Sequence, residues 1–274
     1  MVNKKPELIV IVGPTASGKS EYASKLAKKI NGEIISADSR QVYRGFDIGT
    51  AKIKGQLCTD IADPKKTATI IEWKKCAEDV ITTIYSSGKI PILVGGTGFY
   101  IRTLVDGIVI PEVPPNKKLR TKLEKKSLAS LLKLLEKKDP RRAETVDRKN
   151  KRRIIRALEI IDRLGKVPEL KKIKKYDAKF IGIKRDDLTN RITKRTRDMV
   201  KKGLIREVQR LHKSGISCRR FSELGFEYKY PALYLQKKIS RQDMLDAINR
   251  ETIGYARRQM LWWKKDRRIK WVRI

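Results

Sequence analysis

The sequence of 274 residues contains few cysteines, a single histidine and fewer than half as many acidic as basic residues. Cys58, Cys76 and Cys218 are widely spaced, form no Cys-x-x-Cys pair and have only His212 to join them. This pattern supports neither a disulfide framework nor a zinc site. We therefore expect all three cysteines to be reduced thiols.

Long apolar runs are also missing. The longest, at residues 8–12 and 90–94, have the length of a strand, whereas a membrane-spanning helix needs roughly 20 residues. The first run leads directly into a glycine-rich loop, so we interpret it as a buried strand and not as the core of a signal peptide. The expectation is a cytoplasmic protein without a membrane span.

Positive charge is abundant and unevenly distributed. The chain has 66 Lys and Arg residues against 31 Asp and Glu, a net charge of +35. Residues 1–116 hold 16 basic and 12 acidic side chains (+4), while residues 117–274 hold 50 and 19 (+31). Such an excess predicts a polyanionic partner, most simply nucleic acid, on the second part. A lysine-rich composition bias is the alternative.

The first hundred residues alternate strand-like and helical patterns. Apolar runs predict strands at residues 8–12, 34–37 and 90–94, and helical spacing predicts helices at residues 19–30 and 67–87. This alternation is typical of an α/β fold with a parallel sheet flanked by helices and right-handed crossovers.

A second segment interrupts this alternation. Three prolines within residues 108–115 precede leucines at helical spacing from 119 to 135, and a further helix is predicted at 150–164. A short apolar run at 180–183 returns to the sheet. We therefore predict a core built from residues 1–115 and 177–274, with a mostly helical lobe inserted at 116–176. Long amphipathic helices are expected at residues 188–211 and 241–265.

One motif identifies a phosphate site. Gly13-Pro14-Thr15-Ala16-Ser17-Gly18-Lys19-Ser20 matches G-x-x-x-x-G-K-[ST] and lies between a predicted strand and a predicted helix. Its glycines let backbone N–H groups surround phosphate oxygens, Lys19 neutralises them, and Ser20 can bind Mg²⁺. The motif predicts a P-loop NTPase-like sheet and a bound di- or triphosphate, but not the reaction.

Polar residues follow the next two strands. Ser36-Ala37-Asp38-Ser39-Arg40-Gln41-Val42-Tyr43 closes one strand, and Gly95-Gly96-Thr97-Gly98-Phe99-Tyr100 closes the other. The carboxyl ends of parallel strands form the ligand edge of such sheets, so Asp38 and Thr97 should lie side by side near the phosphate loop. Asp38 can face the reacting centre, hold Mg²⁺ or orient an acceptor hydroxyl as in a kinase, or merely cap a helix.

These motifs resemble the bacterial tRNA dimethylallyltransferases, also called tRNA isopentenyltransferases, along nearly the whole chain. Besides the phosphate loop and the two strand ends, the resemblance rests on three further runs. They are Gly49-Thr50-Ala51-Lys52, Arg152-Arg153-Ile154-Ile155-Arg156-Ala157-Leu158-Glu159, and Arg257-Arg258-Gln259 followed by Trp262. The order and combination of these runs are specific to that family.

The resemblance implies a donor site and a base. Residues 13–20 would hold the diphosphate of dimethylallyl diphosphate, with Mg²⁺ and Lys19 neutralising it and Arg195 as a further clamp. A solvated helix charge is the alternative for Arg195. Asp38 would accept a proton from the exocyclic amine of the adenosine immediately 3′ of the anticodon. Thr97 would orient that amine.

The resemblance also implies a tRNA surface. The adenine would be extruded from the anticodon loop into a channel. The residues carried over as tRNA contacts are Asp38, Ser39, Arg40, Gln41, Thr97, Arg120, Arg152, Arg153, Arg156, Glu223, Leu224, Gly225 and Phe226. Ile154, Ile155 and Leu158 would instead form the core of the lobe. We expect a monomer without an obligate protein partner.

Four aromatic residues lie among basic ones, namely Phe221, Tyr228, Trp262 and Trp263. Stacking on unpaired bases would use such residues, but we expect most of them to be core.

Departures from the family pattern occur at Gln56-Leu57, Asp147-Arg148 and Leu261, outside the phosphate loop and strand ends. Three alternatives remain open at this point. A nucleoside or small-molecule kinase would share the phosphate loop and Asp38. An adenylate prenyltransferase would use a free nucleotide as its acceptor. A non-catalytic RNA-binding protein would carry a decayed phosphate loop. The net charge of +31 after residue 116 argues against the first two, and intact Lys19 and Asp38 argue against the third.

Overall fold

The computed structural model describes residues 6–169 and 172–274, which belong to two compact units. One unit runs to Gly107 and resumes at Lys174, and the other is Ile108–Ile173. The inserted unit thus begins at residue 108 and not at 116 as expected from sequence. The reason is that the proline-containing segment packs with it, since Val113 is buried in its core.

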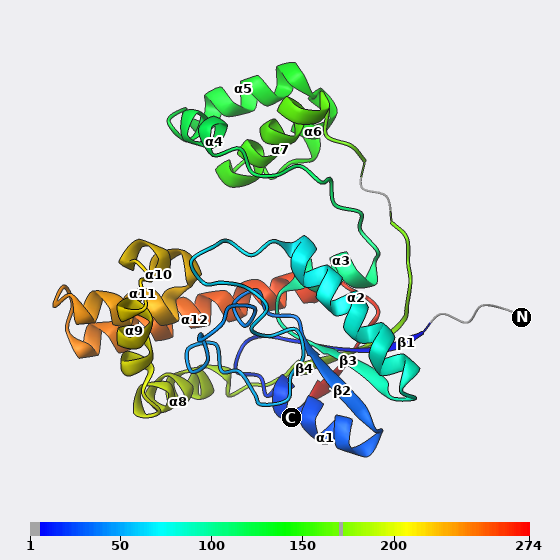
Figure 1. Ribbon diagram of the computed structural model, residues 1–274, viewed down its shortest axis with the longest axis vertical. Coiled ribbons are helices and arrows are strands. Elements are labelled where there is room, and N and C mark those ends of the chain that lie inside the picture. Colours follow the sequence, from blue (N-terminus) through cyan, green and yellow to red (C-terminus); the bar gives the residue numbers. More distant parts are fainter. Residues whose placement is uncertain (1–5, 170–171) are drawn as a thin grey trace, which may run out of the picture. The chain divides into compact units, whose positions relative to one another are not determined.

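The first unit contains a five-stranded parallel sheet within its described residues (Figure 1). Its strands are β1 (Glu7–Val12), β2 (Gly32–Ser36), β3 (Ile90–Val94), β4 (Asp177–Lys184) and β5 (Ile269–Arg273), in the order β2-β3-β1-β4-β5. All four strand pairs are parallel. The predicted α/β class and strands are confirmed, whereas β5 was not predicted.

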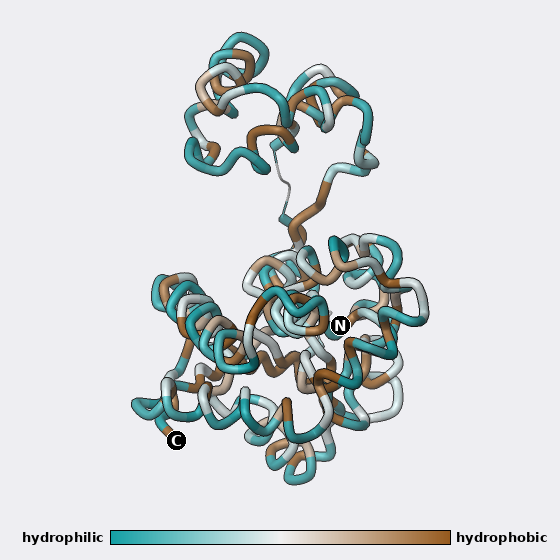
Figure 2. The backbone as a smooth tube through the Cα atoms, turned by 90° about the vertical axis from the view of Figure 1, so that its left-hand side faces the viewer, coloured by the Kyte–Doolittle hydropathy of each residue, from teal (hydrophilic) through white to brown (hydrophobic). Residues whose placement is uncertain are grey.

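Both faces of the sheet are covered. Along β1, Leu8, Val10 and Val12 belong to one buried cluster, and Ile9 and Ile11 to another. This alternation is the period of two that places successive side chains on opposite faces. Helix α1 (Lys19–Lys29) packs on the second cluster and α2 (Ile70–Ser86) on the first. In Figure 2 the tube of this unit is brown mainly in its interior and teal along its outer helices.

Further helices follow the strands. They are α3 (Gly98–Val105), α8 (Leu188–Lys201), α9 (Leu204–Lys213), α10 (Cys218–Leu224), α11 (Phe226–Leu235) and α12 (Arg241–Trp263). The single helix expected at 188–211 is wrong, because Gly203 adopts a left-handed φ of 103° between α8 and α9. Across the described ranges, no helix combines the length and apolar character needed to cross a membrane.

The second unit is helical, with α4 (Lys117–Glu124), α5 (Leu128–Lys138), α6 (Pro140–Thr145) and α7 (Lys151–Leu164). Brown and teal alternate along these helices in Figure 2. Helix α7 begins after Asn150, whose side chain accepts from the N–H of Arg153, and ends at Gly165. Ile154, Ile155 and Leu158 are buried, which confirms their predicted role as core.

The expectation of three reduced thiols is wrong for two of them. Cys58 and Cys76 form a disulfide, with their Cα atoms 6.0 Å apart, while Cys218 is free. Cys58 lies just after Leu57, which bridges to Ile35 of β2, and Cys76 lies on α2. Spacing rules could not reveal the pair, because tertiary packing brings the loop against the helix.

Candidate active site

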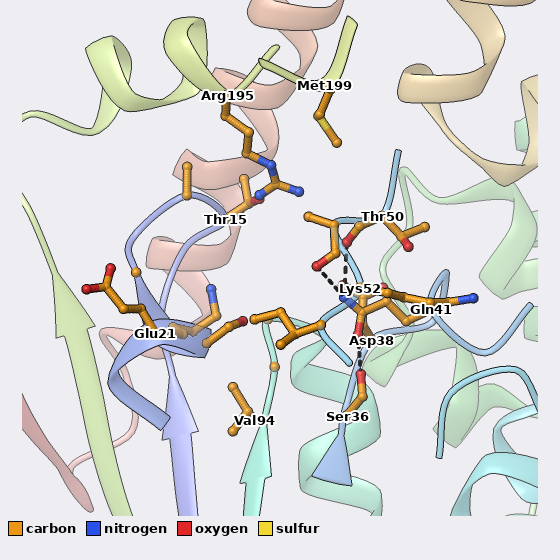
Figure 3. A pocket seen from close by; sticks show the side chains of 18 of the residues that line it. Thr15, Glu21, Ser36, Asp38, Gln41, Thr50, Lys52, Val94, Arg195 and Met199 are labelled. Atoms are coloured by element: carbon orange, nitrogen blue, oxygen red, sulfur yellow. Dashed lines mark hydrogen bonds between the residues drawn. The ribbon is translucent and has the colours of Figure 1, made fainter. Parts of the chain in front are cut away.

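A cavity of about 640 Å³ opens beside the carboxyl ends of the parallel strands. It is lined by the phosphate loop, the ends of β2 and β3, the loop around residues 47–56, helix α8, and Tyr255 and Gln259 of α12. Figure 3 shows Arg195 and Thr15 on one side of this space and Asp38 on the other. The edge of the sheet that was predicted to bind the ligand therefore carries a cavity, and segments distant in sequence line it.

The phosphate loop has the local structure that the motif predicts, since it joins β1 to α1. Gly18 caps α1 with a φ of 90°, a conformation that a glycine adopts without strain. No side chain of the described residues caps this helix end. Its first N–H groups, together with the positive end of the helix dipole, are thus available to an anion.

Three cations surround the loop. The Lys19 ammonium donates to the Pro14 carbonyl at 2.5 Å, Arg195 Nη1 donates to Thr15 Oγ1 at 2.8 Å, and Arg191 Nε donates to the Ala16 carbonyl at 3.0 Å. Burial lowers the pKa of the Lys19 ammonium to about 7, with a further lowering from the Arg195 charge and an opposing effect of Asp38. An anion between these groups would relieve their repulsion.

The sequence predicted Lys19 and Arg195 here but gave no role to Arg191. The signal was available, because residues four apart on a helix share one face. Arg191 and Arg195 both lie on α8 and both reach the loop.

Asp38 and Thr97 meet at the strand ends, as predicted. One Asp38 carboxylate oxygen accepts from the backbone N–H of Arg40 at 2.8 Å, and the Thr97 hydroxyl accepts from the N–H of Ser39 at 3.4 Å. Asp38 lines the cavity and keeps oxygen lone pairs for another partner.

Tyr255 joins this pair and was missed by the sequence reasoning. Burial, and then the charge of Asp38, raise the pKa of the Tyr255 hydroxyl, and the nearby Thr97 side chain opposes this effect. A neutral Tyr255 hydroxyl therefore accompanies Asp38 at the cavity wall.

A buried carboxylate shapes the adjacent loop. Glu207, 4% exposed, accepts from the successive N–H groups of residues 47–49 at 3.2, 2.8 and 3.2 Å and from the Tyr228 hydroxyl at 2.8 Å. The loop held in this way contributes Ile48 and Thr50 to the cavity. Glu207 thus fixes one wall of the site from outside it.

A magnesium ion fits the chemistry of the cavity. The Ser20 hydroxyl and the Asp38 carboxylate both line it, and Mg²⁺ commonly takes only one or two protein oxygens together with phosphate and water. Among the described residues, no group of three His, Cys, Asp or Glu side chains could form a dedicated metal cage. Any Mg²⁺ bound here would therefore depend on phosphate oxygens as well.

The residues expected to contact tRNA lie in both units, and they differ in how far the protein's own contacts already engage them. In the first unit, Arg40 pairs with Glu227 at 2.5 Å and stacks over the ring of Phe226 at 4.7 Å. Gly225 leaves room for that guanidinium, because a Cβ there would lie 2.5 Å from its central carbon. The structure thus brings Arg40, Gly225 and Phe226 together.

Other members of the set lie in different surroundings. Gln41 is buried and bonds Ser36 and the Thr50 carbonyl at 2.6 and 3.0 Å, Leu224 is buried in the core, and Glu223 pairs with Arg220 at 3.0 Å. These three are engaged by the protein's own packing.

In the helical unit, three of the four expected arginines have partners within the unit, and Arg153 has the loosest of these, an ion pair with Asp147 at 3.8 Å. Arg120 donates twice to the carboxylate of Glu159, at 2.7 Å each, and Arg156 donates to the Val113 carbonyl at 2.7 Å. Arg152 and Arg153 are exposed on α7. The exposed pair is therefore better placed to meet a ligand.

The four aromatic residues follow the expectation that most are core. Phe221, Tyr228 and Trp263 are completely buried, whereas Trp262 is 40% exposed.

A parallel sheet with a phosphate loop and a carboxylate across one cavity places the protein in the class of phosphate-loop α/β proteins. Comparison with known proteins narrows the class. The model of the IPP transferase family matches residues 41–266, and that of isopentenyl transferases matches residues 6–56. The chain belongs to the IPP transferase family.

Curated relatives and solved structures agree with this membership. The tRNA dimethylallyltransferase of Syntrophomonas wolfei is 38% identical over 98% of this chain and 92% of its own length, and that of Geobacter sulfurreducens is 39% identical over 98% and 92%. The tRNA isopentenylpyrophosphate transferase of Bacillus halodurans superposes with a TM-score of 0.72 at 35% identity, covering 98% and 90%. A eukaryotic dimethylallyltransferase acting on tRNA gives a TM-score of 0.82 at 27% identity, covering 98% and 74%.

Proposed function

We propose that this chain transfers the dimethylallyl group of dimethylallyl diphosphate to the exocyclic amino nitrogen of the adenosine immediately 3′ of the anticodon in tRNA, releasing diphosphate. One observation carries the proposal. A cationic phosphate loop with an open helix N-terminus faces the Asp38 carboxylate across one cavity. Membership of the IPP transferase family supports the same reaction, and the relatives named above are tRNA dimethylallyltransferases.

The loop side of the cavity suits the leaving group. As the carbon–oxygen bond breaks, negative charge grows on the diphosphate. Lys19, Arg195 and the helix N-terminus are fixed around the loop before that charge appears, which is the arrangement that favours a transition state. Bound Mg²⁺, with the Ser20 hydroxyl as a ligand, would supply further charge neutralisation there.

The strand-end side suits the acceptor. The adenine amine is a weak nucleophile because its lone pair is delocalised into the ring. The new carbon–nitrogen bond forms as one N–H proton is lost, and Asp38 accepts that proton while the diphosphate leaves with the electrons of the carbon–oxygen bond. Thr97, which accepts from the N–H of Ser39 next to Asp38, and Tyr255, which lines the same cavity, would orient the amine. A positioned base contributes about 10² to 10⁴ in rate.

The RNA partner fits the charge. We assign the tRNA-binding role chiefly to the exposed Arg152 and Arg153 of the helical unit, and to the segment around Arg40 and Phe226 that adjoins Asp38. The net charge of +31 beyond residue 116 suits a polyphosphate chain. We further propose that the chain acts as a monomer, in the cytoplasm, where tRNA is found.

The proposal is tested by incubating the protein with Mg²⁺, dimethylallyl diphosphate and a tRNA that has adenosine 3′ of the anticodon, then digesting the tRNA and weighing its nucleosides. The expected result is adenosine heavier by one dimethylallyl group, at that position. A tRNA with guanosine there is the control. Unchanged nucleosides, together with phosphate transfer from ATP to a small acceptor, would favour a kinase instead.

A further inference from the structure

The amide of Gln259 occupies the start of the phosphate loop. Its Oε1 accepts from the backbone N–H of Thr15 at 2.7 Å, although the two residues are 244 positions apart. The side chain comes from α12, is 6% exposed and lines the cavity. One of the N–H groups that the motif would otherwise offer to phosphate is therefore already bonded by the protein.

The rest of the loop remains open toward its helix. Within the part of the chain that the structure describes, the N-terminus of α1 carries no side-chain cap, and the Lys19 ammonium donates to the Pro14 carbonyl. Arg195 reaches the loop at the Thr15 hydroxyl. The backbone donors left for phosphate thus lie at the end of the loop and the start of α1, while the N–H of Thr15 is withdrawn from them.

We propose that Gln259 is a specificity-determining residue that limits the site to two phosphate groups, an inference that rests on the proposed diphosphate donor. Two phosphates fit the helix N-terminus and Lys19. A third would continue along the loop toward Thr15, where the amide oxygen of Gln259 already faces the N–H. Two acceptor oxygens cannot share that donor without repelling each other, so a triphosphate is disfavoured at this position.

Gly96 makes the arrangement possible. A Cβ on Gly96 would lie 2.0 Å from Nε2 of Gln259, and the next nearest atom outside that side chain is the Gly13 carbonyl oxygen at 3.5 Å. Any side chain at residue 96 would therefore displace the amide specifically. The end of β3 and helix α12 thus cooperate to hold the Gln259 oxygen against the loop.

The test is calorimetric binding of inorganic pyrophosphate and of inorganic tripolyphosphate to the full chain with Mg²⁺. The variant Gln259→Met keeps the length of the side chain and removes the acceptor. The ratio of tripolyphosphate Kd to pyrophosphate Kd should fall by about tenfold or more, as expected for one freed hydrogen-bond donor. Gly96→Ala should lower the same ratio of Kd values, because the added methyl group would displace the Gln259 amide from the loop while residue 259 remains glutamine.

Thr252→Val serves as the matched control on α12, since Thr252 is also buried and its hydroxyl donates to the Ile248 carbonyl of the same helix at 2.7 Å. Its ratio should equal that of wild type. An equal change of both affinities in the Gln259 and Gly96 variants, or no change in either, would overturn the inference and leave Gln259 a packing residue. Wild-type protein that binds neither anion would instead refute the diphosphate site itself.

Discussion

Arg195 Nη1 lies 2.8 Å from the hydroxyl oxygen of Thr15, across 180 positions of sequence. This contact holds the guanidinium of Arg195, which lies on α8, against the phosphate loop. If the diphosphate leaves from that loop, Arg195→Ala should lower kcat by about 10² to 10³, because one preorganised donor to the developing charge is lost. Single-turnover kinetics at saturating tRNA would measure it. Arg197→Ala, on the exposed side of the same helix, should keep wild-type kcat, and an equal loss in both variants would contradict the assignment.

The base is tested by Asp38→Asn. An asparagine oxygen can still accept from the N–H of Arg40, so the turn should persist while the proton acceptor is lost. We expect kcat to fall by about 10² to 10⁴, with little change in pyrophosphate affinity. Asp63→Asn is a matched control, since Asp63 makes the same contact with the N–H of Lys65 at 2.8 Å away from the cavity. A fully active Asp38→Asn enzyme would rule out this base.

Glu207→Gln should weaken the loop that lines the cavity. One amide NH₂ would then face N–H groups that now donate to a carboxylate, so we expect a loss of about 1–3 kcal/mol in the free energy of unfolding. Tyr228→Phe, which removes only the hydroxyl donor, should cost less, about 1 kcal/mol. Urea titration of both variants would compare their losses in the free energy of unfolding. A Glu207→Gln protein as stable as wild type would show that the carboxylate does not hold the loop.

Arg152→Ala should affect tRNA and nothing else. The side chain is exposed on α7, so its loss should leave the unfolding midpoint unchanged and raise the Kd for tRNA. The slope of log affinity against log salt should decrease by about 1, as for one lost phosphate contact. Filter binding over a salt series gives the slope. An unchanged slope and Kd would exclude a phosphate contact by Arg152.

The pair of Glu159 and Arg120 predicts how the helical unit responds to acid. Burial alone would raise the pKa of Glu159, but hydrogen bonds from Arg120 and from the Asn116 backbone outweigh it and hold the pKa below its usual range. Because the folded pKa is depressed, the stabilisation is present above the unfolded value of 4.5 and is lost as pH falls through the folded pKa. Glu159→Gln should flatten this dependence, which thermal unfolding followed at several acidic pH values would test.

Local signals made much of the site predictable. The residues of the phosphate loop follow one another in sequence, and Asp38 and Thr97 each come just after a strand of a parallel sheet, so topology brings them to one edge. Helix ends marked by Asn150 and Gly165 were predictable for the same reason, because capping depends on neighbouring residues.

Tertiary contacts were not predictable in this way. Gln259 and Tyr255 reach the cavity from α12. In sequence, Gln259 belongs to a run typical of the family but has no predicted contact, and Tyr255 is an ordinary residue of a long helix. No buried role was predicted for Glu207 or Glu159, and packing buries both. Similarly, the resemblance carried Arg120 over as an RNA contact but could not show that its guanidinium binds Glu159. The spacing of residues predicts which face of a helix or strand a side chain lies on. It does not predict which residue, distant in sequence, that side chain contacts.

In the proposed reaction, release of diphosphate is coupled to alkylation of tRNA. The most direct measurement counts both products in one reaction, with pyrophosphate release followed enzymatically and prenylated adenosine by mass spectrometry. We expect one pyrophosphate per modified adenosine, and almost no pyrophosphate without tRNA. Pyrophosphate release with unmodified tRNA, or inorganic phosphate and ADP formed from ATP in its place, would contradict it.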